Sequence, residues 1–336
     1  MKKWSVKVLI VLFITLLVAG CGPKIQRPGP ASEAAYLSSD QFITDDGISL
    51  PVRQWEPGEQ TSAVVIALHG FNDYSGFITD LADALVQKGI VTYAYDQRGF
   101  GAAPHTGIWA GTEVMQRDLR TFTKLIRQRH PQVPLYLLGE SMGGALILLT
   151  LSQTPELPID GAILSAPAVW GPSTWPWYQR ESLRLGAHLL PWMKVNGKGL
   201  DITASDNSTM LRELGRDPLV IKNSRLDSLW GVSQLMEAAL QAAPQFRVRS
   251  LILIGEKDEI VPLEPSAQMV AALPEEHHDD QQIALYNNGY HMLTRGLQAQ
   301  QVWQDITAWI KNPNTPLPSG ADRGARKRLA ELNNRD

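Results

Sequence analysis

The chain has 336 residues, of which 44% are hydrophobic and 19% are charged, so it is long enough for one large domain or two modest ones. Its formal net charge is −3, so the protein does not have the positive potential typical of nucleic-acid-binding proteins. We therefore expect no nucleic acid as a partner. The single cysteine excludes an internal disulfide framework.

The first twenty residues are typical of a signal peptide. Lys2 and Lys3 give a positive start, residues 8–19 are almost wholly apolar, and small residues precede Cys21. The apolar run is too short for a comfortable membrane span, so we interpret residues 1–20 as a signal that is removed.

The ending "LVAGC" resembles the lipobox of bacterial lipoproteins. The resemblance implies cleavage before Cys21, a diacylglyceryl thioether on its sulfur and a further acyl chain on its new amino group, and two or more chains anchor a protein stably. It also implies a lipid-anchored protein of the bacterial cell envelope. Gly22 stands where an aspartate tends to retain lipoproteins at the inner membrane, so an outer-membrane location is favoured in a Gram-negative source. An ordinary secretory signal with an incidental cysteine is the alternative.

A linker and then a predicted hairpin follow the signal. Residues 21–35 are rich in Pro, Gly and small side chains, and we expect a flexible tether. The stretch "QFITDDGISLPVRQW" contains two extended runs about Asp46-Gly47, which predicts a hairpin.

Buried strands then alternate with amphipathic helices. "SAVVIALHG", "IVTYAYD", "VPLYLLG" and "IDGAILSAP" are strands by their apolar and β-branched runs, with helical spacing between them. This alternation predicts right-handed crossovers and a mostly parallel, doubly wound sheet covered on both faces.

The pattern breaks over residues 168–244 and resumes with "SLILIG", "QQIALYN" and a last helix. We therefore predict an α/β core of residues 36–167 and 245–312, interrupted by a helical cap of residues 168–244. Residues 313–336 form a polar tail that we expect to be disordered or loosely helical. The cap holds five of the ten tryptophans, which either pack the insertion or line an apolar acyl channel: Trp170, Trp175, Trp177, Trp192 and Trp230.

Ser141 lies in "GESMGG", where a predicted strand meets a predicted helix. The pattern G-x-S-x-G at such a turn forces the serine into a strained backbone and lifts its Oγ above the sheet edge. A serine that merely caps the helix N-terminus is the alternative.

A nucleophilic serine needs a base, and two residues in the expected chain order supply the partners. Asp258 follows the strand "LILIG", and His291 follows the last strand. Both fall at the carboxyl ends of strands, where an open α/β sheet places its site. His291 is the candidate base and Asp258 the residue that orients it, with Glu256 and Glu259 as rivals for the second role.

Acyl transfer also requires donors for the developing oxyanion. The backbone N–H of Met142 is one candidate, and the N–H of Phe71, in the loop after "VVIALHG", is the other. His69 lies in that loop, and we interpret it as structural because the base should follow the serine in the chain.

Five segments together resemble the α/β-hydrolase superfamily, in its monoacylglycerol lipase and lysophospholipase-like branch: "LHGFNDYSG", "YAYDQRGFG", "GESMGG", "GEKDEIVP" and "NNGYHML". The resemblance covers about residues 60–310. It implies a helical cap over the site, the triad Ser141, Asp258 and His291, and oxyanion donors at Phe71 and Met142. The chain lacks the longer Gly-Pro-rich loop of proline aminopeptidases and carries Ser141 where dehalogenases and epoxide hydrolases use aspartate.

We expect no cofactor and no metal, because two further motifs do not fit a dinucleotide loop or a metal site. "RGFGAAP" lacks the third glycine of a dinucleotide loop, and the adjacent histidines of "EEHHDD" cannot easily face one ion.

The sequence therefore predicts a membrane-tethered serine hydrolase of carboxylic esters, with lipid or lysolipid acyl esters as substrates and the membrane reached through Cys21. A peptidase or amidase using the same triad, and a non-catalytic envelope-binding lipoprotein, are the alternatives. The sequence does not determine the oligomeric state.

Overall fold

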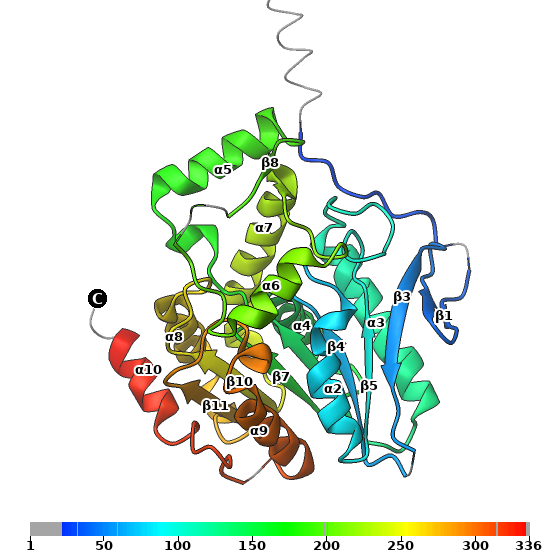
Figure 1. The fold of residues 1–336 in the computed structure, drawn as a ribbon, viewed down its shortest axis with the longest axis vertical. Coiled ribbons are helices and arrows are strands. Elements are labelled where there is room, and N and C mark those ends of the chain that lie inside the picture. Colours follow the sequence, from blue (N-terminus) through cyan, green and yellow to red (C-terminus); the bar gives the residue numbers. More distant parts are fainter. Residues whose placement is uncertain are drawn as a thin grey trace, which may run out of the picture.

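The computed structural model describes residues 22–333 except 32, 59, 198, 200 and 314. A nine-stranded sheet runs through the molecule, with strand order β1-β2-β3-β5-β4-β6-β7-β10-β11 (Figure 1). The strands from β5 to β11 are parallel, and β1 to β3 form an antiparallel edge that includes the predicted hairpin. The strands are β1 (Tyr36–Leu37), β2 (Gln41–Ile43), β3 (Ser49–Trp55), β4 (Ala63–Leu68), β5 (Ile90–Tyr95), β6 (Leu135–Glu140), β7 (Gly161–Ser165), β10 (Ser250–Gly255) and β11 (Gln281–Tyr286).

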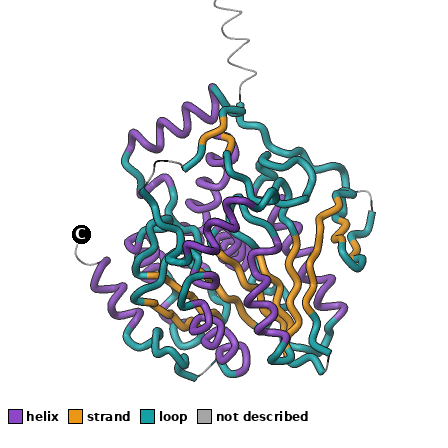
Figure 2. Tube along the Cα trace, viewed as in Figure 1, coloured by secondary structure: helices purple, strands orange, loops and turns teal. Residues whose placement is uncertain are grey.

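Helices cover both faces of this sheet, and Figure 2 shows the strands as a central layer between them. Alternate residues of a strand face opposite ways, so in β4 Val64 and Ile66 join one hydrophobic cluster while Val65 and Ala67 join the other. One face is covered by α3 (Thr112–Arg129), α4 (Met142–Gln153), α8 (Leu263–Ala272) and α10 (Ala325–Asn333), and the other by α2 (Thr79–Val86) and α9 (Ala299–Lys311). Short 3-10 turns join them at η1 (Ser75–Ile78), η4 (Glu275–His277) and η5 (Leu293–Arg295).

The strand order reverses at β4, because β5 lies on one side of it and β6 on the other. The chain leaves β4 and β6 in opposite directions, so the loops after these strands diverge and leave a crevice at their carboxyl ends. Those are the loops that carry Phe71 and Ser141, which is why this edge of the sheet holds the candidate site.

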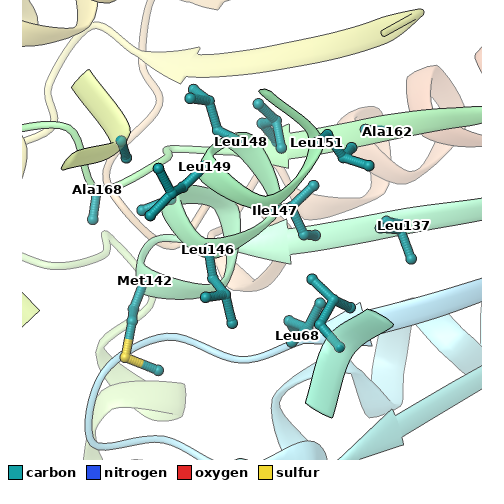
Figure 3. Packing of buried hydrophobic residues seen from close by; sticks show 14 of the residues in the cluster. Leu68, Leu137, Met142, Leu146, Ile147, Leu148, Leu149, Leu151, Ala162 and Ala168 are labelled. Carbon is teal, nitrogen blue, oxygen red and sulfur yellow. The ribbon is translucent and has the colours of Figure 1, made fainter. Parts of the chain in front are cut away.

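Helix α4, which begins directly after Ser141, is buried from Met142 to Leu151. A helix that is apolar all round belongs in a core, and Figure 3 shows Leu146 and Ile147 of α4 beside Leu68 and Leu137 of the sheet. Packing on all sides fixes the start of α4 and therefore the position of Ser141.

The insertion lies between β7 and β10, which pair directly, so it leaves the sheet and returns to it at neighbouring strands. Its α7 packs on α4, and α5 packs on α7, with Ala187 as the buried residue of α5. The elements of the insertion are η2 (Pro172–Thr174), α5 (Trp177–Leu189), β8 (Lys194–Val195), α6 (Ser208–Arg216), β9 (Ser224–Arg225), α7 (Leu226–Ala242) and η3 (Ala243–Gln245).

Two segments near the ends of the described chain, one before β1 and one after α9, contact the rest of the domain. The Gln26 N–H donates to the Trp109 carbonyl at 2.9 Å, so the segment expected to be a flexible tether lies against the domain. Proline restricts such a segment beforehand, which reduces the entropy lost when it is held. In the tail, α10 packs on α8 and fully buries Leu329. The apolar residues that dock this short polar helix are Ala325 and Leu329, which are buried, and Leu332, which is partly buried.

Within the part of the chain that the structure describes, no helix combines the length and the apolar character needed to span a bilayer.

Candidate active site

Ser141 occupies the sharp turn between β6 and α4. Its φ of 54° and ψ of −115° lie in a region that side chains other than glycine rarely adopt, at a cost of about 1–3 kcal/mol. A Cβ at Gly143 would lie 2.3 Å from the Leu68 carbonyl oxygen, and a Cβ at Gly139 would lie 2.4 Å from the Gly143 carbonyl carbon. Because both obstacles are backbone atoms, this turn requires the two glycines of G-x-S-x-G.

Backbone hydrogen bonds, and not the serine hydroxyl, hold this turn. The Ser141 N–H donates to the Ser165 carbonyl at 2.9 Å, and the Ser141 carbonyl accepts from the N–H groups of Ala145 and Ala168. The hydroxyl makes no capping hydrogen bond to α4, and the residue is partly exposed. The capping alternative therefore does not describe Ser141, whose hydroxyl is left for other chemistry.

The structure brings Asp258 and His291 together. Nδ1 of His291 lies 2.7 Å from Oδ2 of Asp258, and both side chains are nearly buried. The other carboxylate oxygen, Oδ1, accepts from the N–H groups of Ile260 at 2.8 Å and Val261 at 2.9 Å, which orients the carboxylate. When Nδ1–H donates to Asp258, the remaining ring nitrogen, Nε2, carries the lone pair of a base.

The two rivals of Asp258 are occupied elsewhere. Glu256 pairs with Arg328 at 2.7 Å, and Glu259 accepts from the Thr203 N–H at 2.6 Å. The sequence favours Asp258 over these two rivals, and in the structure the three carboxylates have different partners.

The loop after β4 lies directly against the serine. A Cβ at Gly70 would lie 3.3 Å from Ser141 Cβ and 3.9 Å from its Oγ. Phe71, the predicted donor, directly follows Gly70 in the chain and is therefore adjacent to the residue that lies against the serine. Met142, the second predicted donor, is the first residue of α4, where backbone N–H groups lack intrahelical partners.

His69 is fully buried, and both of its ring nitrogens are engaged. Nε2 accepts from the Gln97 N–H at 3.0 Å, and Nδ1 lies 2.8 Å from the Gly70 carbonyl oxygen. Burial lowers the pKa of His69, so the ring stays neutral and braces the loop.

The cap is joined to this same loop by three hydrogen bonds. The Asn72 side-chain amide donates to Ser224 Oγ at 2.7 Å, and the Asn72 carbonyl accepts from the Ile221 N–H at 2.9 Å. The Tyr74 hydroxyl donates to Asp217 at 2.8 Å. The cap residues thus contact the neighbours of Phe71.

Several predicted features lie away from these loops or outside the described residues. Trp177 and Trp192 are exposed on the cap, whereas Trp170 packs against the core and stacks edge-on with Trp175. Cys21, the predicted lipidation residue, falls outside the described residues. Across the ranges that the structure describes, no His, Cys, Asp and Glu side chains cluster in a way that could hold a metal ion.

Sequence reasoning missed a buried ion cluster formed by Asp73, Glu140 and Arg295. Glu140 directly precedes Ser141, and Arg295 follows His291 by four positions. The sequence signal that could have revealed this cluster is the presence of charged residues close to the predicted catalytic residues.

Comparison with known proteins agrees with this fold. A family model described as serine aminopeptidase, S33, matches residues 59–298. Monoglyceride lipase of Mus musculus is 25% identical over 284 residues, covering 82% of this chain and 91% of its own. Monoacylglycerol lipase of Mycolicibacterium smegmatis is 25% identical over 284 residues, covering 81% and 96%.

A solved structure of a soluble variant of monoglyceride lipase from Saccharomyces cerevisiae, in complex with a substrate analog, superposes with a TM-score of 0.66 at 22% identity. It covers 87% of this chain and 98% of its own. The strand order, the strained serine and a family match over more than half of the residues establish that the chain belongs to the family described as serine aminopeptidase, S33, and has the α/β-hydrolase fold.

Proposed function

We propose that this protein is a serine hydrolase of carboxylic esters, with lipid or lysolipid acyl esters as its substrate class. The observation that carries the proposal is the buried hydrogen bond between His291 Nδ1 and Asp258 Oδ2. Ser141 supplies the nucleophile, because its backbone is strained and its hydroxyl does not cap α4. The similarity to proteins named monoglyceride lipase and monoacylglycerol lipase supports the substrate class.

The proposed reaction runs through an acyl-enzyme. Ser141 Oγ attacks the acyl carbonyl carbon while His291 Nε2 takes the hydroxyl proton, and Asp258 stabilises the resulting imidazolium. The N–H groups of Phe71 and Met142 receive the oxyanion, and one such donor contributes about 2.7–4 kcal/mol to transition-state stabilisation. His291 then returns the proton to the leaving alcohol, and water attacks the acyl-enzyme by the same steps.

A fluorophosphonate probe tests the nucleophile. Wild type should be labelled and should hydrolyse simple esters, whereas Ser141→Ala should lose both. Labelling that survives in Ser141→Ala would rule out this assignment.

The peptidase or amidase alternative keeps one argument in its favour, because the matched family is described as a serine aminopeptidase. The same triad can cleave either bond, so geometry alone does not separate them. A panel of monoacylglycerols, lysophospholipids and aminoacyl amides decides: preferential turnover of the amides would replace the ester proposal.

We also propose that the protein is tethered to a membrane through lipidated Cys21, in the bacterial envelope and at the outer membrane in a Gram-negative source. Support comes from the cap apolar surface, a set of exposed side chains on α5 and the loop after it, with Trp177 at 72% and Trp192 at 55% exposure. Exposed aromatic and aliphatic residues of this kind favour the membrane interface. The surface comprises Trp177, Tyr178, Leu185, Leu189, Leu190, Trp192 and Met193.

The start of the described chain lies next to β8 and to one end of α5, the helix that carries much of this surface (Figure 1). The Lys24 N–H donates to Asp227 at 3.2 Å, and the Asp227 N–H donates to the Pro191 carbonyl at 3.3 Å. An anchor at Cys21 would therefore hold the cap apolar surface at the lipid.

Metabolic labelling with an alkyne fatty acid tests the tether. The full chain should incorporate the label and sediment with membranes, and Cys21→Ser should incorporate none. Equal labelling of the two proteins would refute the tether and leave the hydrolase proposal standing.

A further inference from the structure

Three chain segments that carry or adjoin the proposed catalytic groups each contribute one charged side chain to a single buried cluster. Asp73 follows Phe71 by two positions, Glu140 directly precedes Ser141, and Arg295 follows His291 by four. The exposed fractions of these side chains are 7%, 2% and 8%. No two of the three are close in the sequence, so the cluster exists only in the folded chain.

One nitrogen of the guanidinium makes both ionic contacts. Nη2 of Arg295 lies 2.9 Å from Oδ2 of Asp73 and 2.5 Å from Oε1 of Glu140. Thr294, the neighbour of Arg295, donates its hydroxyl to the other Glu140 oxygen at 3.1 Å. Phe77 covers the guanidinium, with its ring centroid 5.8 Å from Arg295 Cζ.

The cation stays charged in this place. Burial alone would lower the pKa of Arg295, but the charges of Glu140 and Asp73 outweigh it and raise that pKa. Both carboxylates therefore retain a permanent counterion.

Buried ion clusters are weak evidence of stabilisation, because desolvation cancels much of the attraction between the charges. Their better supported use is to fix which segments meet and in what register. The segments that meet here are the loop after β4, the serine turn and the histidine loop.

We propose that Arg295 is a positioning residue for the hydrolytic reaction, which holds these three loops at the separation that proton transfer and oxyanion binding require. The proposal rests on the hydrolase function proposed above. Arg295 acts through Glu140 on the serine turn and through Asp73 on the loop of Phe71, and it contacts no reacting atom.

The test compares Arg295→Met with a matched control elsewhere in the fold. Arg98 is also a buried arginine between two carboxylates, Asp46 and Asp118, but it joins the hairpin to α3 and no proposed catalytic loop. Rates are measured on a short soluble ester, per active site titrated with a fluorophosphonate, at a temperature at which circular dichroism shows each variant folded.

Arg295→Met should lower kcat by about 10²-fold, the effect of misplacing catalytic groups by about 1 Å, and should leave KM within twofold. Arg98→Met should lower the melting temperature without lowering kcat. Arg295→Lys should have a kcat at least tenfold above that of Arg295→Met, because a single nitrogen makes both ionic contacts of Arg295. Glu140→Gln, which preserves shape, should also lower kcat, and its effect should not add to that of Arg295→Met.

Equal kcat values for wild type and Arg295→Met would overturn the proposal, as would equal losses of kcat in Arg295→Met and Arg98→Met. If Arg295→Met yields no folded protein, the same decision rests on Glu140→Gln, whose unchanged kcat would overturn it. Failure of the hydrolase proposal is separate, because it would show as fluorophosphonate labelling or turnover that persists in Ser141→Ala.

Discussion

Asn72 and Ser224 join the loop of a predicted oxyanion donor to the cap, through a hydrogen bond of 2.7 Å between the Asn72 amide and Ser224 Oγ. Asn72 has a φ of 68°, a left-handed conformation that asparagine tolerates better than most residues. The residue that follows Phe71 is therefore held from the cap side, so the placement of the cap bears on the geometry of the site.

Removing the acceptor should loosen the cap without straining the loop. Ser224→Ala loses a hydrogen bond with a net contribution of about 1 kcal/mol. We expect KM for a long-chain monoacylglycerol to rise by about fivefold, with KM for p-nitrophenyl acetate unchanged, as measured by steady-state kinetics. Ser233→Ala is the control, because that hydroxyl bonds the Trp230 carbonyl within α7. A change in KM of the same size in both variants would contradict a role for the contact with Asn72.

Replacing Asp258 should remove the orientation of the base. In Asp258→Asn the His291 ring loses the carboxylate that selects its tautomer, and kcat should fall by about 10⁴-fold. Glu256→Gln and Glu259→Gln, which touch Arg328 and Thr203, should keep kcat within a fewfold of wild type. Ester hydrolysis rates measure all three, and a large loss in either glutamate variant would reassign the role.

His69 predicts a specific dependence of stability on pH. Burial lowers the pKa of His69 in the folded chain below its ordinary value of about 6.5. The unfolded chain therefore binds a proton first as pH falls, and stability is lost below about pH 6.5 by up to about 1.36 kcal/mol per pH unit.

Urea unfolding at pH 7.5, 6.5 and 5.5 checks this expectation against His69→Gln, which cannot titrate. The wild type should lose more free energy of unfolding than the variant between pH 6.5 and 5.5. Parallel pH profiles of the two proteins would contradict a neutral, buried His69.

The tail helix should contribute to the stability of the domain. Leu329 of α10 is fully buried, and Leu329→Ala should lower the free energy of unfolding by about 2–4 kcal/mol. Lys327→Ala, at an exposed position of the same helix, should change it by less than about 0.5 kcal/mol. Equal unfolding midpoints of Leu329→Ala and wild type would show that the tail adds nothing to the core.

The sequence predicted the strand and helix pattern well, because these elements depend on local periodicity. "SAVVIALHG" became β4, and the hairpin at Asp46-Gly47 became the antiparallel pair of β2 and β3. Gly47 has a φ of 76°, which only a residue such as glycine adopts readily. The α/β-hydrolase fold was predictable for the same reason, since strand–helix alternation restricts the topology.

The contacts that the tail and the segment before β1 make with the domain were not predicted from the sequence. Composition reports whether a segment can build its own core, and neither segment can. Leu329 instead uses the core that α8 has already formed, and Gln26 uses carbonyl groups of a loop more than 80 positions away. Such docking leaves almost no local signal.

By itself, the sequence determined the candidates for chemistry: Ser141 on a turn that requires glycine, followed in order by an acidic residue and a histidine at strand ends. Only the tertiary structure decided which acid meets His291, that Ser141 does not cap its helix, and that Arg295 joins Glu140 across 155 positions. The physical reason is the range of the interactions. Turn geometry and periodicity act over a few residues, whereas the direction of a buried side chain is settled by the packing of segments that are distant in the chain.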